Sequence, residues 1–243
     1  MNIPKQPACK HFGFMLLVST VLLNTGCRQL GQHQQTDFLK PFATASSPLS
    51  GRNLGTMPSD HTLCVETAKT VAAEGHADEA IKLYLRAEKI DPKAASVDAQ
   101  LAPLYASVGN YPAAIERYQR CVKQSPSDIE LCNNFAWTLM EAGHHELAIA
   151  EATRGLNQAG DHARLQATLA MIHYRQGNHD KAFQSFETAQ GSTAAHHNLS
   201  LLDIDAGNLE SAREHLRAAN QSGEHNSQSQ ILLTAFEAQT TGN

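Results

Sequence analysis

Apolar residues recur at helical spacing through most of the chain after residue 60. Around the stretch NNFAWTLMEAG, Cys132, Phe135, Ala136 and Leu139 follow an i, i+3, i+4, i+7 spacing, which marks one buried stripe of an α-helix. Trp137, the single tryptophan of the chain, falls roughly 150° from that stripe at 100° per residue. The pattern therefore predicts a helix whose largest apolar side chain points away from the core.

The helical pattern repeats with a period of 34 residues, and each copy is marked by a glycine and, five positions later, an alanine. The glycines are Gly75, Gly109, Gly143 and Gly177, the alanines are Ala80, Ala114, Ala148 and Ala182, and Gly207 and Ala212 continue the series after a shorter step of 30 residues. The pattern predicts pairs of amphipathic helices around a glycine turn, with alanine allowing the two backbones to approach closely. Because one pair cannot bury both of its faces, we expect the pairs to stack into a solenoid.

An aromatic residue follows the alanine by four positions at Tyr84, Tyr118 and Phe186, and Pro92 and Pro126 stand at the end of the first two copies. Together with the period, these residues resemble the tetratricopeptide repeat. The resemblance implies an all-α, right-handed superhelical solenoid of about five helix pairs with a C-terminal capping helix. The expected units are 61–94, 95–128, 129–162, 163–192 and 193–226, followed by the capping helix and tail in 227–243.

Several positions depart from the pattern of this family. In the first helix, the position where a bulky residue is usual is occupied by Cys64, Asp98, Cys132 and Gln166 in the first four units. In the second helix of the third unit, Ala152 replaces the usual aromatic residue and Gly155 replaces the usual alanine. The departures in the first helix predict looser packing between the helices. Pro103 lies inside a first helix and is expected to kink it, because proline removes one hydrogen bond. In the capping helix, the expected buried stripe is Ile231, Leu232, Ala235 and Phe236.

The N-terminal residues have the pattern of an export signal. Lys5 and Lys10 form a positive segment, and an apolar segment over 12–23 follows it, as in a signal peptide. We therefore expect residues 1–26 to be a signal peptide. No stretch of about 20 apolar residues is present, so an ordinary membrane-spanning helix is not expected.

The ending LLNTGC resembles the lipobox of bacterial lipoproteins, in which the cysteine is lipidated after cleavage just before it. Gly26 fits the lipobox, whereas Asn24 stands where leucine is usual. The resemblance implies lipidation at Cys27 and a membrane anchor for residues 27–60, whose Gln, Ser, Pro and Gly content predicts a flexible tether. Plain cleavage and an uncleaved anchor are the alternatives.

The composition limits the classes of function. Apolar residues make up 42% of the 243 positions, which is enough for a packed core. The net charge of −5 lacks the basic footprint of a nucleic-acid-binding protein. His76, His144, His145 and His179 fall in the expected turns without the spacing of a metal site. No phosphate-binding loop, G-x-S-x-G or S-x-x-K sequence is present, so we expect no catalytic residue, metal or cofactor.

Three cysteines, Cys64, Cys121 and Cys132, lie in the expected repeats. An exported compartment permits disulfides, so Cys121 and Cys132 could pair across a helix–turn–helix. Three small buried thiols are the alternative, and we favour it because free cysteine is among the most buried residue types.

The resemblance implies that the first helix of each pair lines a concave inner surface, at the positions that Trp137 and its neighbours occupy. Amide side chains at matching positions of two units, Asn134 and Asn198, could donate to and accept from a peptide backbone. The expected partner-binding groove comprises Glu130, Asn133, Asn134, Trp137, Met140, Glu141, Arg164, Met171, Tyr174, Arg175, His197, Asn198 and Leu201. Aromatic and Met side chains ringed by charge are typical of interaction surfaces. Internal packing of Trp137 against Tyr174 is the alternative.

These features predict a non-catalytic scaffold that binds a protein or peptide and is anchored in the bacterial cell envelope by lipid. The stretch LCNNFAWTLMEAG resembles the matching repeat of lipoproteins that assist pilus assembly or secretion, which implies a role of that kind. Arg28 is not the Asp that retains such lipoproteins at the inner membrane of enteric bacteria, so the expected location is the outer membrane, facing the periplasm. The alternatives are an envelope protein that binds a small ligand or metal and a regulatory subunit of an enzyme complex.

Overall fold

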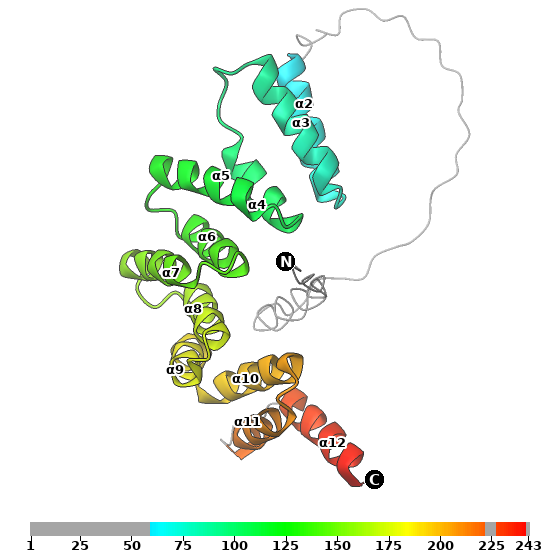
Figure 1. Cartoon of the computed structure of the whole chain (residues 1–243), viewed down its shortest axis with the longest axis vertical. Helices are drawn as coiled ribbons and strands as arrows, with labels where there is room; N and C mark the ends of the chain where they lie inside the picture. The colour runs from blue at the N-terminus through cyan, green and yellow to red at the C-terminus, as the bar shows by residue number, and fades with distance from the viewer. Residues whose placement is uncertain (1–58, 222–226, 242–243) are drawn as a thin grey trace, which may run out of the picture. The chain divides into compact units, whose positions relative to one another are not determined.

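The computed structural model describes residues 59–221 and 227–241, which form α-helices joined by short connections (Figure 1). In chain order the helices are α2 (Asp60–Ala73), α3 (Ala77–Ile90), α4 (Asp98–Ser107), α5 (Tyr111–Gln124), α6 (Ile129–Glu141), α7 (His145–Ala159), α8 (Ala163–Arg175), α9 (His179–Gln190), α10 (Ser192–Ala206), α11 (Leu209–Gln221) and α12 (Ser227–Thr241). All of them belong to one compact unit, Leu54–Asn243. The expected signal peptide, the lipidation site Cys27 and the tether up to residue 58 lie outside the described residues.

The helices pack in consecutive antiparallel pairs, from α2 with α3 to α10 with α11. The second helix of each pair also packs against the first helix of the next pair, and α12 packs against α11. Figure 1 follows the pairs from α2 (cyan) to α12 (red). The predicted all-α solenoid of five helix pairs and a C-terminal helix is confirmed. None of the described helices combines the length and the apolar character that crossing a membrane requires.

The glycine turns form as the repeat pattern predicts, and the turn between α6 and α7 shows why glycine is needed. Gly143 has a φ of +80°, a conformation that costs a residue with a Cβ atom free energy. Its N–H donates to the carbonyl oxygen of Met140 at 3.0 Å, and the N–H of His144 donates to that of Leu139 at 2.8 Å. These two bonds satisfy carbonyl groups that the end of α6 would otherwise leave unpaired.

The regularly spaced alanine and aromatic residues form the interior of each pair. The alanines of the five copies, Ala80, Ala114, Ala148, Ala182 and Ala212, are all completely buried. The aromatic residues Tyr84, Tyr118 and Phe186 are buried too. Tyr118 of α5 also stacks on Phe135 of α6, with ring centroids 5.4 Å apart. The repeat positions therefore pack both within a pair and between neighbouring pairs.

The third pair is packed more tightly than the sequence predicted. A Cβ atom on Gly155 of α7 would lie 2.7 Å from Cδ1 of Leu165 and 3.0 Å from Cβ of Cys132. Leu165 and Cys132 are themselves completely buried. The expectation of looser packing is wrong at Cys132, because the missing side chain of Gly155 lets α7 approach α6 and α8 closely.

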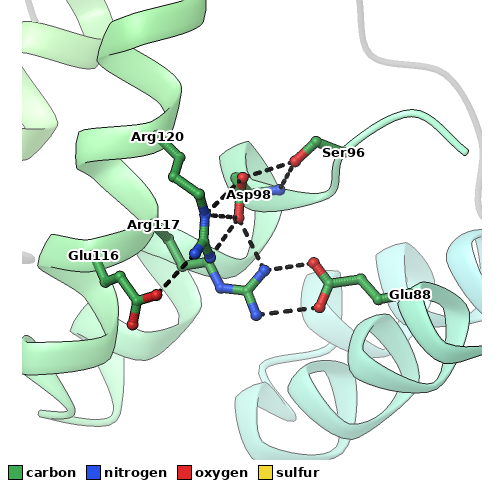
Figure 2. Close-up of polar contacts among 6 residues, drawn as sticks. All are labelled: Glu88, Ser96, Asp98, Glu116, Arg117 and Arg120. Atoms are coloured by element: carbon green, nitrogen blue, oxygen red, sulfur yellow. Dashed lines mark hydrogen bonds and ion pairs between the residues drawn. The ribbon is translucent and has the colours of Figure 1, made fainter. Parts of the chain in front are cut away.

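The junction between the first two pairs contains a buried ionic network around Asp98 (Figure 2). Asp98 occupies the position where a bulky residue is usual, and it is buried at the start of α4. Its carboxylate accepts hydrogen bonds from Nη1 of Arg117 at 2.9 Å, from Nε of Arg120 at 3.1 Å and from Oγ of Ser96 at 2.8 Å. The guanidinium of Arg117 also pairs with Glu88 of α3, with Nη2 and Oε2 3.1 Å apart. The network thus links α3, α4 and α5.

The arginines determine the protonation state of Asp98. Burial by itself would raise the pKa of the Asp98 carboxyl, but hydrogen bonds from Arg120, Arg117 and Ser96 outweigh burial and lower the pKa below its ordinary value. Asp98 is therefore a buried anion with two cationic partners, and removing both arginines would leave its charge uncompensated. Beyond Asp98, α4 continues to Ser107 with Pro103 inside it.

The C-terminal helix α12 contacts the array through a face that differs from the expected one. Ser229 is completely buried, and Leu232, Leu233 and Phe236 are half-buried. Ile231 is 68% exposed, and Ala235 is exposed too, so the expected stripe is wrong at these two positions. The buried face is instead centred on the polar Ser229, which hydrogen-bonds His197 of α10.

Candidate partner-binding face

The residues of the predicted groove lie on the first helices of three consecutive pairs, α6, α8 and α10. Local sequence determines where the first two helices begin. The side chain of Asp128 accepts from the N–H of Leu131 at 3.0 Å and caps α6, and His162 caps α8 through Nδ1 and the N–H of Leu165 at 3.4 Å. A side chain that accepts from a free helical N–H in this way defines the helix start.

The structure divides the thirteen predicted residues into accessible and buried sets. The exposed residues are Glu130, Asn134, Arg164 and Arg175, the half-buried residues are Trp137, Glu141, Tyr174, Asn198 and Leu201, and the buried residues are Asn133, Met140, Met171 and His197. Nine of the thirteen therefore have surface through which a partner could be contacted. We call these nine residues the candidate face.

The four buried residues correct the prediction of an open groove at their positions. Met140 is only 1% exposed and Met171 only 6%, so neither presents a surface to a partner. Oδ1 of Asn133 accepts from Oγ1 of Thr168 at 2.8 Å, which joins α6 to α8. The physical reason is that neighbouring first helices pack on each other. A residue on the flank of one helix therefore meets the next helix instead of open space.

Trp137 behaves as the helical pattern predicts. It is half-buried, whereas Cys132, Phe135, Ala136 and Leu139 on the opposite stripe are all buried. Asn134, one turn before it on the same helix, is exposed. Trp137 thus offers part of a large apolar surface beside an amide that can donate and accept hydrogen bonds.

The charges of the candidate face pair with one another across the helices. Arg164 of α8 pairs with Glu130 of α6 at one end of the two helices. At the other end, Nη2 of Arg175 lies 2.8 Å from Oε1 of Glu141. Each pair joins residues that are 34 positions apart, the length of one repeat. The face is therefore close to electrically neutral around Trp137.

Tyr174 connects α8 to α10 instead of standing free. Its hydroxyl donates to Oδ1 of Asp203 at 2.7 Å, and Oγ of Ser211 donates to Oδ2 of the same carboxylate at 2.6 Å. Burial and the hydrogen bond to Asp203 raise the pKa of the Tyr174 phenol above its ordinary value. Tyr174 also packs edge-on against His179, with ring centroids 5.0 Å apart. Packing of Trp137 on Tyr174 was the alternative to a binding groove. No such contact is among the aromatic ring contacts of the described residues.

Sequence reasoning missed the polar residues that hold the first helices together, namely Thr168, Asp203 and Ser229. All three are buried and hydrogen-bonded to a residue on the preceding first helix of the array. A signal for one of them was present in the sequence, because Thr168 follows Asn134 by the repeat length of 34 residues. It therefore stands at a first-helix position that a polar residue also occupies in the preceding unit. A polar residue that becomes buried at such a position needs a hydrogen-bond partner.

Cysteine and histidine side chains form no reactive or ligating centre in the described part of the chain. The three cysteines of the repeats, Cys64, Cys121 and Cys132, are free and buried, which confirms the prediction of three buried thiols. Burial raises the pKa of the Cys121 and Cys132 thiols, which lowers their thiolate content. Within residues 59–221 and 227–241, no group of three His, Cys, Asp or Glu side chains is arranged to hold a metal ion.

Comparisons with known proteins identify the repeat. Two family models, both described as tetratricopeptide repeat, match residues 105–172 and 163–196. No curated protein sequence matches the chain. The two family matches extend from the end of α4 to the start of α10.

Solved structures share the fold at low sequence identity. A MamA fragment from Desulfovibrio magneticus RS-1 is 18% identical, with 70% of this chain and all of that chain covered and a TM-score of 0.52. The tetratricopeptide repeat protein TTC0263 of Thermus thermophilus is 18% identical, covering 73% of this chain and 99% of that chain, with a TM-score of 0.51. A tetratricopeptide repeat protein of Parabacteroides merdae ATCC 43184 is 15% identical, covering 74% and 73%, with a TM-score of 0.56.

Tetratricopeptide repeats are non-catalytic modules that mediate protein–protein interaction, and no enzyme family is indicated for this chain. Fold likeness at this identity carries no information about the partner. The helix pairs, the glycine turns and the two family models agree on one conclusion: this chain carries tetratricopeptide repeats, arranged as a superhelical solenoid.

Proposed function

We propose that the chain is a non-catalytic scaffold that binds a segment of a partner protein on the candidate face of α6, α8 and α10. The observation that carries this proposal is the position of Trp137. Trp137 is partly accessible, whereas Cys132, Phe135, Ala136 and Leu139 on the opposite stripe of α6 are buried. It therefore keeps apolar surface in water, and such surface is typical of interaction sites.

The surroundings of Trp137 favour an extended, weakly charged segment as the partner. The acidic and basic side chains on both sides, Glu130 with Arg164 and Glu141 with Arg175, already neutralise one another. Asn134 is exposed. The hydrogen bond that Nδ2 of Asn198 donates to Gln190 is long, at 3.3 Å. Apolar contact with Trp137 and amide hydrogen bonds to a backbone are therefore the contributions the face can offer.

We further propose that Cys27 is lipidated and anchors the scaffold at the outer membrane, facing the periplasm, where it serves pilus assembly or secretion. This part is supported by sequence alone: the lipobox-like LLNTGC, the Gln- and Ser-rich residues after it, and the likeness of LCNNFAWTLMEAG to the repeat of pilus-assembly lipoproteins. The negative net charge of the chain argues against nucleic acid as the partner.

A site-specific crosslink tests the binding face directly. A photoreactive phenylalanine derivative replaces Trp137 in the full chain, and the crosslinked product formed in cells is identified by mass spectrometry. Thr153, an exposed residue on α7 of the same pair, is the matched control position. One discrete product from position 137 that is missing from position 153 supports the proposal. Equal products from both positions, or none from 137 and from the neighbouring face position 134, overturn it.

A further inference from the structure

The last first helix, α10, is joined to the C-terminal helix α12 by a buried polar contact. Nδ1 of His197 and Oγ of Ser229 are 2.8 Å apart. His197 is 3% exposed and Ser229 is completely buried. The contact lies where a sixth first helix would pack if the repeats continued. A buried histidine therefore contacts α12 on α10, in addition to the packing of α12 against α11.

Among the described residues, no charged side chain offsets the effect of burial on the imidazole of His197. Burial lowers the pKa of this imidazole. The groups on the neighbouring helices face other partners. On α10 and α11, Asp203 binds Tyr174 and Ser211, with Nε2 of His215 3.7 Å away. On α12, Glu237 lies 4.0 Å from Arg217 of α11.

The adjacent His196 belongs to a different contact. Its Nδ1 lies 3.0 Å from Nδ1 of His215 on α11, and its ring packs against Phe183 of α9 with centroids 4.7 Å apart. Burial, together with His215, lowers the pKa of His196, although Glu187 of α9 acts in the opposite direction. The pKa of His215 is likewise lowered by burial, with Asp203 and Glu214 acting against burial. These two histidines hold α10 to α11 and α9, whereas His197 meets α12.

We propose that α12 is a cap that acid releases: a proton taken up by His197 favours the state in which α12 has left α10. In the docked state the imidazole is held neutral inside the protein. In the released state it is in water and takes up a proton with an ordinary pKa of about 6.5. The released state therefore binds more protons, and docking weakens as the pH falls.

The size of the effect follows from the number of protons. Above about pH 6.5 both states are neutral at His197, so the docked state keeps its full stability. Below that pH, release is coupled to one proton, and the equilibrium constant for release rises by up to about tenfold per pH unit. The rise ends at the lower pKa of the docked imidazole. Release would also uncover His197 next to Asn198 of the candidate face, and that consequence alone rests on the proposed function.

Hydrogen–deuterium exchange of the full chain between pH 8 and pH 5 measures the release itself. After correction for the intrinsic exchange rate, protection of α12 should fall by up to about tenfold per pH unit below about pH 6.5. Protection of α6, which contains no histidine, serves as the internal reference. His197→Asn keeps a neutral group at the position of Nδ1 and should remove the pH dependence of α12.

Two control variants separate His197 from the other histidines. His173→Asn replaces a histidine on α8 whose pKa burial also lowers, and it should leave the slope of α12 unchanged. If His215→Asn removes the slope and His197→Asn does not, the proposal is overturned. The same holds if α12 shows no pH dependence in the unmodified protein. Either of these two outcomes would overturn the cap but would leave the crosslinking test of the binding face at position 137 unaffected.

If the His197→Asn substitution itself detaches α12, a direct titration of the unmodified chain still tests the proposal. The imidazole of His197 in the full chain is followed by nuclear magnetic resonance. A pKa clearly below about 6.5 that rises toward the ordinary value when Ser229→Ala weakens the contact supports the cap. A pKa at or above the ordinary value in the unmodified chain overturns it.

Discussion

Leu165 of α8 occupies the space beside Gly155 of α7, so that a Cβ atom at position 155 would come within 2.7 Å of Leu165 Cδ1. Two effects of a Gly155→Ala substitution therefore oppose each other. Alanine is favoured over glycine inside a helix by about 1 kcal/mol. Overpacking a tight interior typically costs about 1–3 kcal/mol. Because Leu165 and Cys132 are both fully buried and cannot move into solvent, we expect overpacking to dominate.

The expected result for Gly155→Ala is a lower free energy of unfolding, measured by urea denaturation followed by circular dichroism. Thr153→Ala, at an exposed position of the same helix, is the control and should raise stability slightly, by up to about 0.7 kcal/mol, because alanine is the better helix former. An increase in stability for Gly155→Ala would contradict the close approach of α7 and α8.

Asp98→Ala should destabilise the chain more than most single substitutions. It removes the buried carboxylate that Arg117, whose side chain is only 15% exposed, shares with Arg120, and leaves Arg117 with the more exposed Glu88 as its partner. Removing one member of a buried ion pair costs about 3–5 kcal/mol. Thermal unfolding of the variant measures the loss. Glu116→Ala is the matched control, because Glu116 also pairs with Arg120 but is largely exposed. A similar, small effect of both variants would show that the network adds little.

The same carboxylate predicts a pH dependence. The pKa of Asp98 is lowered in the folded state, so the unfolded chain takes up a proton first as the solution becomes acidic. The stability that Asp98 contributes is present above its ordinary pKa of about 3.9 and is lost as the pH falls through the lower folded pKa. The difference in unfolding free energy between the unmodified chain and Asp98→Asn should therefore shrink from about pH 6 to about pH 3. A constant difference would be inconsistent with a lowered pKa.

The two ion pairs between α6 and α8 should differ in strength. The side chains of Glu141 and Arg175 are 19% and 33% exposed, against 54% and 56% for Glu130 and Arg164. Exposed pairs contribute about 0–1 kcal/mol, because solvent screens their charges. Double-mutant cycles with alanine should give a measurable coupling energy for Glu141 and Arg175 and almost none for Glu130 and Arg164. Equal coupling energies would contradict this order.

Lipidation of Cys27 is tested by metabolic labelling with palmitate. Cys27→Ser should abolish incorporation of the label, because the thiol that would carry the lipid is missing. Cys9→Ser removes a cysteine within the expected signal peptide and should leave labelling intact. An unmodified chain that takes up no label would favour plain cleavage instead.

The repeat positions could be predicted from the sequence because their causes are local. The turn at Gly143 depends on the φ of one residue, and Ala148 is buried because its own pair of helices closes on it. The period of 34 residues then repeats both effects along the chain. Such features need no knowledge of how one pair is placed against the next.

The accessible part of the candidate face could be predicted only in part. A helical projection identifies the side of α6 on which Met140 lies, but it does not show that this residue becomes buried. The partial exposure of Trp137 could be predicted, because this residue points away from the buried stripe of its own helix. The partners of Asp98 could not be predicted either, since Arg117 and Arg120 are 19 and 22 residues away in the sequence.

The contacts between pairs have a consequence for how the chain folds. The bonds that join the first helices, from Glu130 with Arg164 to His197 with Ser229, span no more than 35 residues of sequence. Short spans require little loop closure, so chains rich in them fold quickly. Each pair can therefore form as soon as it and its neighbour have emerged from the ribosome. Structure would then grow from α2 toward α12, and the helix made last, whose buried contact with α10 joins His197 and Ser229, would be the first to come apart.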